Sequence, residues 1–196
     1  MSALTRRSSH VESNFGGPAL ASAILRAVLG ATMIAHGVRH GRTLEGTARW
    51  FESIGFRQAK AQAVTSSLLE VGAGAGLLAG AATPLVGASV VGTMAVAVQT
   101  VHRPNGFFVV DEGWEYVAFV AAGAVALSSL GAGPLSVDRR WGLDRIGRPW
   151  TRALFTLGLG VVGALVQLKV FWRRPAPAPV AEEPAAGLAE EAQASA

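Results

Sequence analysis

Five apolar blocks, each long enough to cross a lipid bilayer as a helix, constrain the fold of this chain more than any other feature. A membrane-spanning helix needs about 20 mostly apolar residues. Composition agrees, because 51% of the residues are hydrophobic and only 15% are charged, whereas soluble domains carry about 25% charged residues. The sequence therefore predicts an all-α integral membrane protein. The predicted spans are residues 19–38, 62–79, 84–101, 114–131 and 151–172.

The two ends of the chain are polar. Residues 1–18 lack the apolar core and cleavage site of a signal peptide, so we expect them to stay in the mature protein. Residues 175–196 are rich in Pro, Ala and Glu, which predicts a disordered acidic tail. The chain has no cysteine, which excludes disulfides and thiolate metal sites. Its net charge of +4 comes from loop arginines and favours anionic membrane lipids, not nucleic acid, as the contacting partner.

The second and third blocks are expected to form a tight antiparallel hairpin. Only a few residues separate them, and Pro84 suits the first turn of the third helix. In the second block, Gly72, Gly76 and Gly80 repeat at intervals of four residues. This spacing places them on one helical face, where small residues let a neighbouring helix approach closely. We therefore predict a helix-packing role for the three glycines, with a hinge as the alternative.

Two long connections are predicted to lie along the membrane surface. Within residues 39–60, apolar residues recur at helical spacing between charged ones, which is typical of an interfacial amphipathic helix. We expect Trp50, Phe51 and Phe56 to lie at the level of the lipid headgroups. The connection 134–150 is similar, with tryptophans and aliphatic residues as candidate anchors.

Glu70 stands in an otherwise apolar run of the second block. A charge at membrane depth costs about 2.5–3.5 kcal/mol on insertion scales, so it usually faces a partner, a cavity or a pathway. Arg26 in the first block lies at a similar depth when helix lengths are counted from the block ends, and we predict an Arg26–Glu70 pair. The alternative is that Arg26 extends to the near end of its own helix. The pair would either fix helix register or form the polar floor of a ligand cavity, and the sequence leaves both uses open.

Four further polar residues are predicted to line the mouth of such a cavity, on one side of the membrane: His36, His102, Glu115 and Tyr116. Two histidines on different helices could ligate a haem, but no other pattern supports one and we do not expect it. We predict no metal ion, because an acidic residue such as Asp111 is favoured at a helix N-terminus without one. The glycine-rich run lies inside an apolar helix and not after a strand, which excludes a dinucleotide-binding motif.

Six short segments, taken together and in order, resemble motifs of the DoxX family. The similarity extends over about residues 19–144. The segments are Arg26–His40 (RAVLGATMIAHGVRH), Trp50–Phe56 (WFESIGF), Glu70–Gly80, Thr83–Pro84, Gly106–Tyr116 (GFFVVDEGWEY) and Leu135–Asp138 (LSVD).

This resemblance implies a four-helix transmembrane bundle over residues 19–144, to which residues 145–174 add a linker and a fifth transmembrane helix. It implies a multi-pass protein of the cell membrane with a cytoplasmic N-terminus. Some relatives are quinone-reducing subunits, and others associate with redox proteins. We therefore expect an accessory subunit of a membrane redox system that contacts quinone or lipid above the Arg26–Glu70 pair, with redox-protein partners and a possible homo-oligomer. A non-catalytic membrane scaffold and a small proton-coupled transporter are the alternatives, and an enzymatic activity of the chain alone is not predicted.

Overall fold

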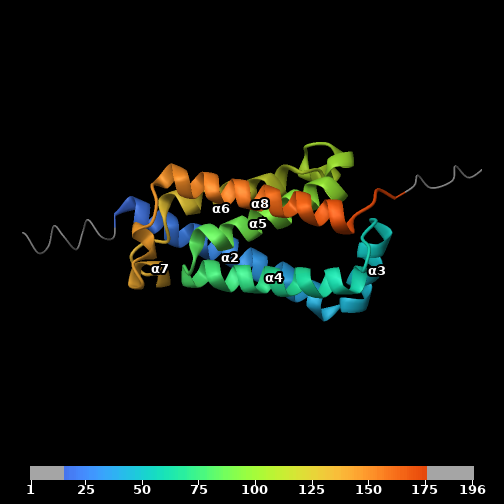
Figure 1. Cartoon of the computed structure of the whole chain (residues 1–196), viewed down its shortest axis with the longest axis horizontal. Helices are drawn as coiled ribbons and strands as arrows, with labels where there is room; N and C mark the ends of the chain where they lie inside the picture. Colours follow the sequence, from blue (N-terminus) through green and yellow to red (C-terminus); the bar gives the residue numbers. More distant parts are fainter. Residues whose placement is uncertain (1–15, 176–196) are drawn as a thin grey trace, which may run out of the picture.

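The computed structural model describes residues 16–175, which form an elongated bundle of helices (Figure 1). The all-helical prediction is confirmed for these residues. The predicted polar N-terminal segment and acidic tail fall almost entirely outside them. The long helices are α2 (Gly17–Arg42), α4 (Ala59–Ala79), α5 (Thr83–Ala97), α6 (Glu115–Leu130) and α8 (Pro149–Phe171). The short elements are α3 (Leu44–Ser53), the π-helix η1 (Val98–His102), α7 (Val137–Arg140) and the 3-10 turns η2 (Arg103–Asn105), η3 (Val109–Asp111) and η4 (Leu143–Arg145).

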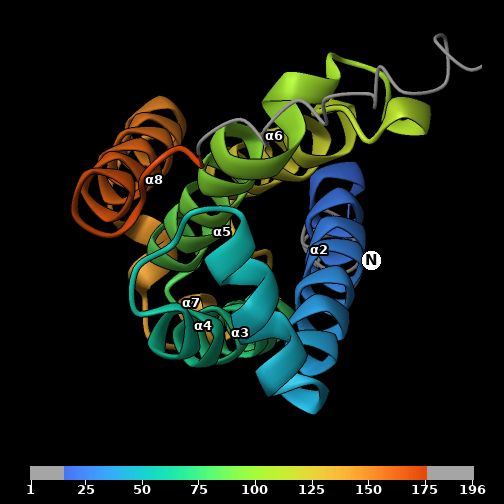
Figure 2. The ribbon, with the colours of Figure 1, turned by 90° about the vertical axis from the view of Figure 1, so that its right-hand side faces the viewer.

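Helix α5 lies at the centre of the bundle. It contacts α4, α6 and α8, while α2 closes the opposite side by packing along α4 and against α6 (Figure 2). Helix α8 packs on the outside of α5 and α6 and is therefore farthest from α2. The short helix α3 crosses one end of the bundle, next to the C-terminal end of α8 (Figures 1 and 2).

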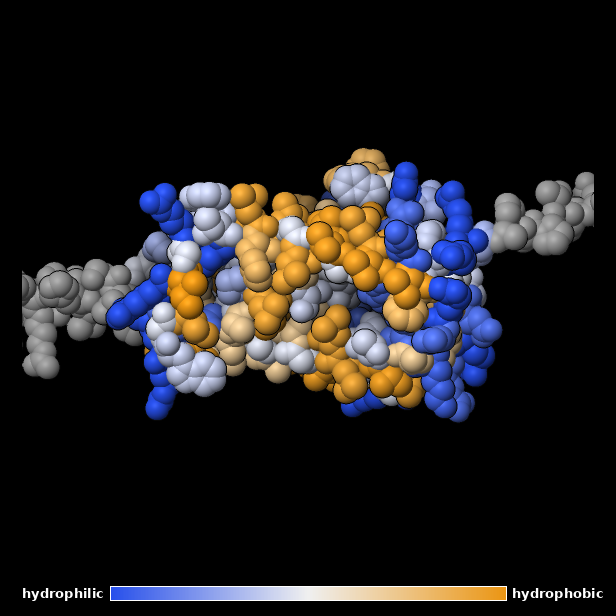
Figure 3. Space-filling view, in the orientation of Figure 1, coloured by the Kyte–Doolittle hydropathy of each residue, from blue (hydrophilic) through white to orange (hydrophobic). Residues whose placement is uncertain are grey.

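The surface of the bundle matches a membrane environment. Apolar side chains gather along its middle, and hydrophilic ones gather at both ends (Figure 3). Three helical segments are long and apolar enough to cross a bilayer: Gly17–Arg42, Thr83–Asn105 and Pro149–Phe171. Helix α6 is apolar but shorter. Helix α4 contains Glu70 and several hydroxyl and amide side chains. Because α6 is short and α4 is partly polar, the crossing of the membrane by these two helices stays a prediction.

Close packing of α2 on α4 depends on glycines other than the predicted three. A methyl group placed on Gly74 would lie 2.6 Å from the carbonyl oxygen of Gly30, and one on Gly37 would lie 2.8 Å from backbone atoms of α4. In contrast, Gly72 has no neighbour within 4 Å of such a methyl group. Gly76 faces Val86 across the α4–α5 hairpin. The three glycines therefore do not share one packing face: Gly76 and Gly80 are closely packed, each against a different segment, and Gly72 is not.

Gly80 ends α4 and is closely packed there, because a methyl group on it would lie 2.6 Å from Cβ of Ser136 and 3.1 Å from Cβ of Ala132. Its φ of +63° is left-handed, a conformation that favours glycine at the C-terminus of a helix. The hairpin that follows is as predicted, with Pro84 in the first turn of α5. Asp138 caps this turn from outside the hairpin. Its two carboxylate oxygens accept hydrogen bonds from the backbone nitrogens of Ala82 and Thr83, at 2.6 and 2.9 Å, and a negative charge is favoured at that helix terminus.

The amphipathic helix is confirmed as α3, but two of its predicted interfacial residues are buried. Phe51 and Phe56 are 7% and 4% exposed and belong to an apolar cluster with Ala63, Val96 and Ala164. They are covered because the α3–α4 connection pairs with the end of α8, as described below. Of the three aromatic residues predicted at headgroup level, Trp50 is the one that remains substantially exposed, at 43%.

Candidate functional site

Glu70 is buried inside the α3 end of the bundle, with 3% of its surface exposed. Ser66, one helical turn earlier on α4, donates a hydrogen bond to its Oε1 at 2.7 Å. His40, on the last turn of α2, places Nδ1 3.2 Å from its Oε2. His40 Nδ1 and Glu70 Oε2 lie within ion-pair distance, but they are not aligned as a hydrogen bond. Both atoms are buried, and neither has another hydrogen-bond partner among the described residues. A buried polar atom in this state can accept a contact from a ligand.

The predicted Arg26–Glu70 pair is wrong. Arg26 donates its guanidinium hydrogens to the backbone carbonyls of Leu77 at 3.0 Å and of Leu78, and to those of Ala132 and Leu135 at 3.0 and 2.8 Å. It thus joins carbonyls at the end of α4, where helical carbonyls lack their usual partners, to carbonyls of the segment that follows α6.

The physical reason for the error is the register of the two helices. The contact between Gly30 and Gly74 fixes α2 on α4 so that Arg26 lies level with Leu78. Leu78 is eight residues from Glu70, which is about 12 Å along a helix. Counting depth from the ends of the apolar blocks had placed Arg26 and Glu70 too close together.

A cavity of about 350 Å³ opens beside the His40–Glu70 pair. This volume lies at the lower end of the range for small-molecule sites. Most of its exposed wall is apolar, and its polar side chains come from several helices and include the His40–Glu70 pair. The lining comes from α2, α3, α4, α5 with η1, and α8, and includes His40, Trp50, Phe51, Ile54, Phe56, Gln62, Thr65, Ser66, Leu69, Glu70, Thr93, Thr100, Gln167 and Phe171.

Helix α8 covers one side of this cavity through polar contacts. Gln167 donates a hydrogen bond to the side-chain oxygen of Gln62 on α4, at 3.0 Å. One turn farther on, the backbone nitrogen of Arg57 donates to the carbonyl of Phe171 at 2.7 Å. The indole nitrogen of Trp172 donates to the carbonyl of Ile54 at 2.7 Å. These contacts fasten the end of α8 to the α3–α4 connection and so help to enclose the cavity.

The π-helix η1 forms another part of the cavity wall. It interrupts the regular hydrogen bonding of α5 at Val98–His102, and Thr100 and Val101 from this segment line the cavity. π-Helical turns inside α-helices occur frequently at functional sites. Thr100 donates its hydroxyl to the carbonyl of Val96 at 2.9 Å.

The remaining predicted site residues fall into two groups, and neither lines the cavity. His36 and Tyr116 stack across α2 and α6 with ring centroids 6.4 Å apart, on an exposed surface, and His36 lies 6.4 Å from the His40 ring. His102 and Glu115 instead hold the connection between α5 and α6. Nδ1 of His102 lies 2.6 Å from the carbonyl oxygen of Glu112. The carboxylate of Glu115 accepts a hydrogen bond from the backbone nitrogen of Val109 at 3.0 Å.

Two other expectations concern the same connection. Asp111 does not cap α6, because it lies in the 3-10 turn η3 and Trp114 precedes the helix without a side-chain cap. No cluster of three metal-ligating side chains occurs among residues 16–175.

Sequence reasoning missed His40, although a signal for it exists. His40 follows His36 by four residues, which is one helical turn, but the first predicted helix ended at Val38. The structure continues α2 to Arg42 and thereby brings His40 onto the helix, next to Trp50 at a ring distance of 6.3 Å.

Comparison with known protein families bears directly on this site. The family model DoxX matches residues 21–103. This segment is therefore similar to the DoxX family, and the match supports a DoxX assignment. The DoxX segment spans α2 to the start of η2 and contains both His40 and Glu70, while α6 and α8 follow it. No curated protein and no solved structure matches the chain.

Proposed function

We propose that this DoxX-like membrane protein binds a quinone-class ligand beside the His40–Glu70 pair and serves as an accessory subunit of a membrane redox system. The observation that carries the proposal is the cavity itself: a mostly apolar chamber of about 350 Å³ whose lining includes the His40–Glu70 pair, with its buried atoms that lack a hydrogen-bond partner among the described residues. Ligand sites commonly combine an apolar wall with a few convergent polar groups.

The chemistry of a quinone suits these groups. A quinone ring presents two carbonyl oxygens that accept hydrogen bonds, and its reduced form presents hydroxyls that donate them. Buried His40 Nδ1 and Glu70 Oε2 have no hydrogen-bond partner among the described residues. A carboxylate held against one ring nitrogen also orients a histidine, so that the other nitrogen can face a ligand. Trp50, Phe51 and Phe56 supply the aromatic surface that a planar ring requires.

The first test separates binding from folding. The full chain is purified in native lipid, its quinones are extracted, and its melting temperature is followed as a short-chain quinone is added. We expect co-purified quinone and a rise in melting temperature that Glu70→Gln and His40→Ala abolish. Thr32→Ala on α2, outside the cavity lining, is the control and should respond like the wild type. Absence of quinone, together with an unresponsive wild type, would refute the proposal.

For topology, we propose five membrane crossings with the N-terminus in the cytoplasm. The proposal is supported by three helices of spanning length and by the apolar character of α6. The chain has no cysteine, so single cysteines introduced at Ser8 and Ser195 can be labelled in intact cells without background. With a cytoplasmic N-terminus and five crossings, the C-terminus lies outside the cell. An impermeant maleimide should therefore label Ser195→Cys and not Ser8→Cys. Labelling of both or of neither indicates an even number of crossings.

A further inference from the structure

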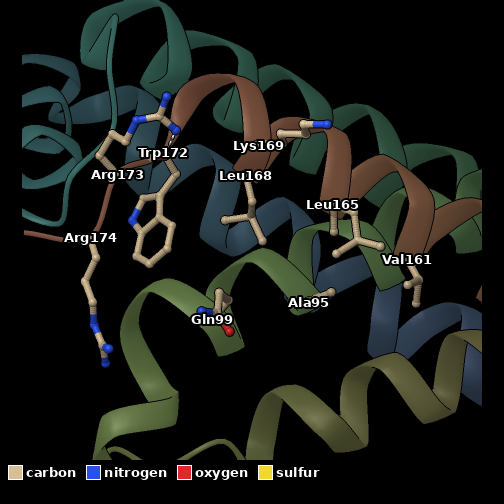
Figure 4. Close-up of a pocket in the computed structure, with 10 residues that line it drawn as sticks. Ala95, Gln99, Val161, Leu165, Leu168, Lys169, Trp172, Arg173 and Arg174 are labelled. Carbon is tan, nitrogen blue, oxygen red and sulfur yellow. Dashed lines mark hydrogen bonds between the residues drawn. The ribbon is translucent and has the colours of Figure 1, made fainter.

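A second depression, separate from the His40 cavity, lies on the outer surface between α5 and α8 (Figure 4). It is a shallow groove of about 670 Å³. The lining residues of α8, Val161, Leu165, Leu168 and Lys169, follow one another at helical spacing, and Trp172 follows the helix. Ala95 of α5 and Gln99 of η1 face them. We define these residues, with Ala164, Arg173 and Arg174, as the α5–α8 groove.

The groove is divided into an apolar and a cationic part. Val161 and Leu165 lie within α8, a segment long and apolar enough to cross the membrane. In the proposed topology, on which this argument rests, this part of the groove faces hydrocarbon. Lys169, Arg173 and Arg174 lie at the end of the same helix and are exposed. The distance along α8 from Val161 to Lys169 is eight residues, or about 12 Å, which is a substantial part of the length of an acyl chain.

Among the described residues, no acidic side chain lines the groove to neutralise these charges. A further guanidinium lies beside it, because Arg103 donates to the side-chain oxygen of Gln99 at 3.0 Å. The carbonyls at the end of α8 would ordinarily repel an anion. Two of them, those of Val170 and Phe171, already accept hydrogen bonds from Arg57. The positive charges are therefore free to contact an anionic group.

We propose that the α5–α8 groove binds one anionic phospholipid, with its phosphate at the cationic end of the groove and an acyl chain along Leu168, Leu165 and Val161. Arg174 extends on the α5 side of this end, and Lys169 and Arg173 add positive charge on the other side (Figure 4). The site is independent of the proposed quinone cavity. Basic side chains at the end of a transmembrane helix attract anionic headgroups, and Trp172 occupies the interfacial position that tryptophans favour. The continuity of the cations with a hydrocarbon-facing stripe is what favours a lipid over a soluble anion or a protein.

The test uses native mass spectrometry of the full chain in detergent, titrated with phosphatidylglycerol or with phosphatidylcholine of the same acyl chains. Each Lys or Arg near an anionic surface strengthens the attraction about fivefold. We therefore expect the wild type to bind phosphatidylglycerol at concentrations at least tenfold lower than phosphatidylcholine. The variant Lys169→Gln/Arg173→Gln/Arg174→Gln is expected to lose this preference. Arg140→Gln/Arg145→Gln/Arg148→Gln, which removes three exposed charges at the other end of the bundle, is the matched control and should keep it.

Three outcomes would overturn the proposal. The first is an equal preference in the wild type and the triple variant, with helical content unchanged by circular dichroism. The second is displacement of bound phosphatidylglycerol by excess inorganic phosphate, which would indicate an anion site without a chain contact. The third is a preference that emerges only after the acidic residues of the C-terminal segment (Glu182, Glu183, Glu190 and Glu191) are changed to Gln, which would assign the groove to the chain's own tail.

Discussion

The substitution Gly74→Ala tests the packing of α2 on α4, the contact that sets the register of the bundle. The new methyl group would lie 2.6 Å from both the carbonyl oxygen of Gly30 and Cγ1 of Ile34, and 2.9 Å from the backbone nitrogen of Ile34. Backbone atoms cannot move aside without shifting a whole helix. Overpacking of this kind costs about 1–3 kcal/mol.

Gly72→Ala is the matched control, two residues away on the same helix. Nothing lies within 4 Å of a methyl group at that position. Both substitutions gain the same helix propensity, about 1 kcal/mol for Gly to Ala, so this contribution cancels when the two are compared. The remaining difference in unfolding free energy is the packing cost, and we expect Gly74→Ala to be less stable than Gly72→Ala by about 1–3 kcal/mol.

The assay is equilibrium unfolding of each variant in mixed micelles with increasing dodecyl sulfate, followed by circular dichroism. The reasoning would be refuted if the two variants unfolded with the same free energy within about 0.5 kcal/mol, the usual range of surface substitutions. It would also be refuted if Gly72→Ala were the less stable variant, since that would restore the packing face predicted from sequence.

The same unfolding assay checks two caps. Asp138→Ala leaves the backbone nitrogens of Ala82 and Thr83 without their acceptors and should cost about 3 kcal/mol, while Asp138→Asn retains one acceptor and should cost roughly half as much. Arg26→Lys keeps the positive charge but loses the planar fork that reaches several carbonyls at once, so we expect a loss of about 1–3 kcal/mol. An effect of Arg26→Lys that disappeared in a Glu70→Gln background would contradict the assignment of Arg26 to the carbonyls of α4.

Much of the fold follows from the sequence, because block length and apolar content are local properties. The hairpin before Pro84 and the amphipathic helix from Leu44 to Ser53 are both present in the structure. The tertiary consequences are less accessible. Phe51 has the pattern of an interfacial residue, yet it is buried, since the end of α8 hydrogen-bonds to the connection that follows α3. Nothing local to residues 44–56 encodes that contact.

The candidate site could be predicted only in part, again because tertiary contacts are not encoded locally in the sequence. Glu70 stood out because a lone carboxylate in an apolar run is rare, and the structure buries it beside a cavity. Its partner could not be identified, because one additional turn of α2 and the glycine contacts with α4 decide which residue faces it. That turn places His40 next to Glu70, and the register moves Arg26 to the far end of α4.

The central claim is that the cavity beside His40 and Glu70 holds a quinone, and a photoreactive quinone analogue tests it most directly. The purified chain is irradiated with the bound analogue, and the modified residues are identified by peptide mass spectrometry. The account predicts labels on cavity-lining residues such as Trp50 and Leu69, suppressed by an excess of unlabelled quinone and by Glu70→Gln. Labels confined to the α5–α8 groove, or labels that an excess of quinone does not suppress, would contradict it.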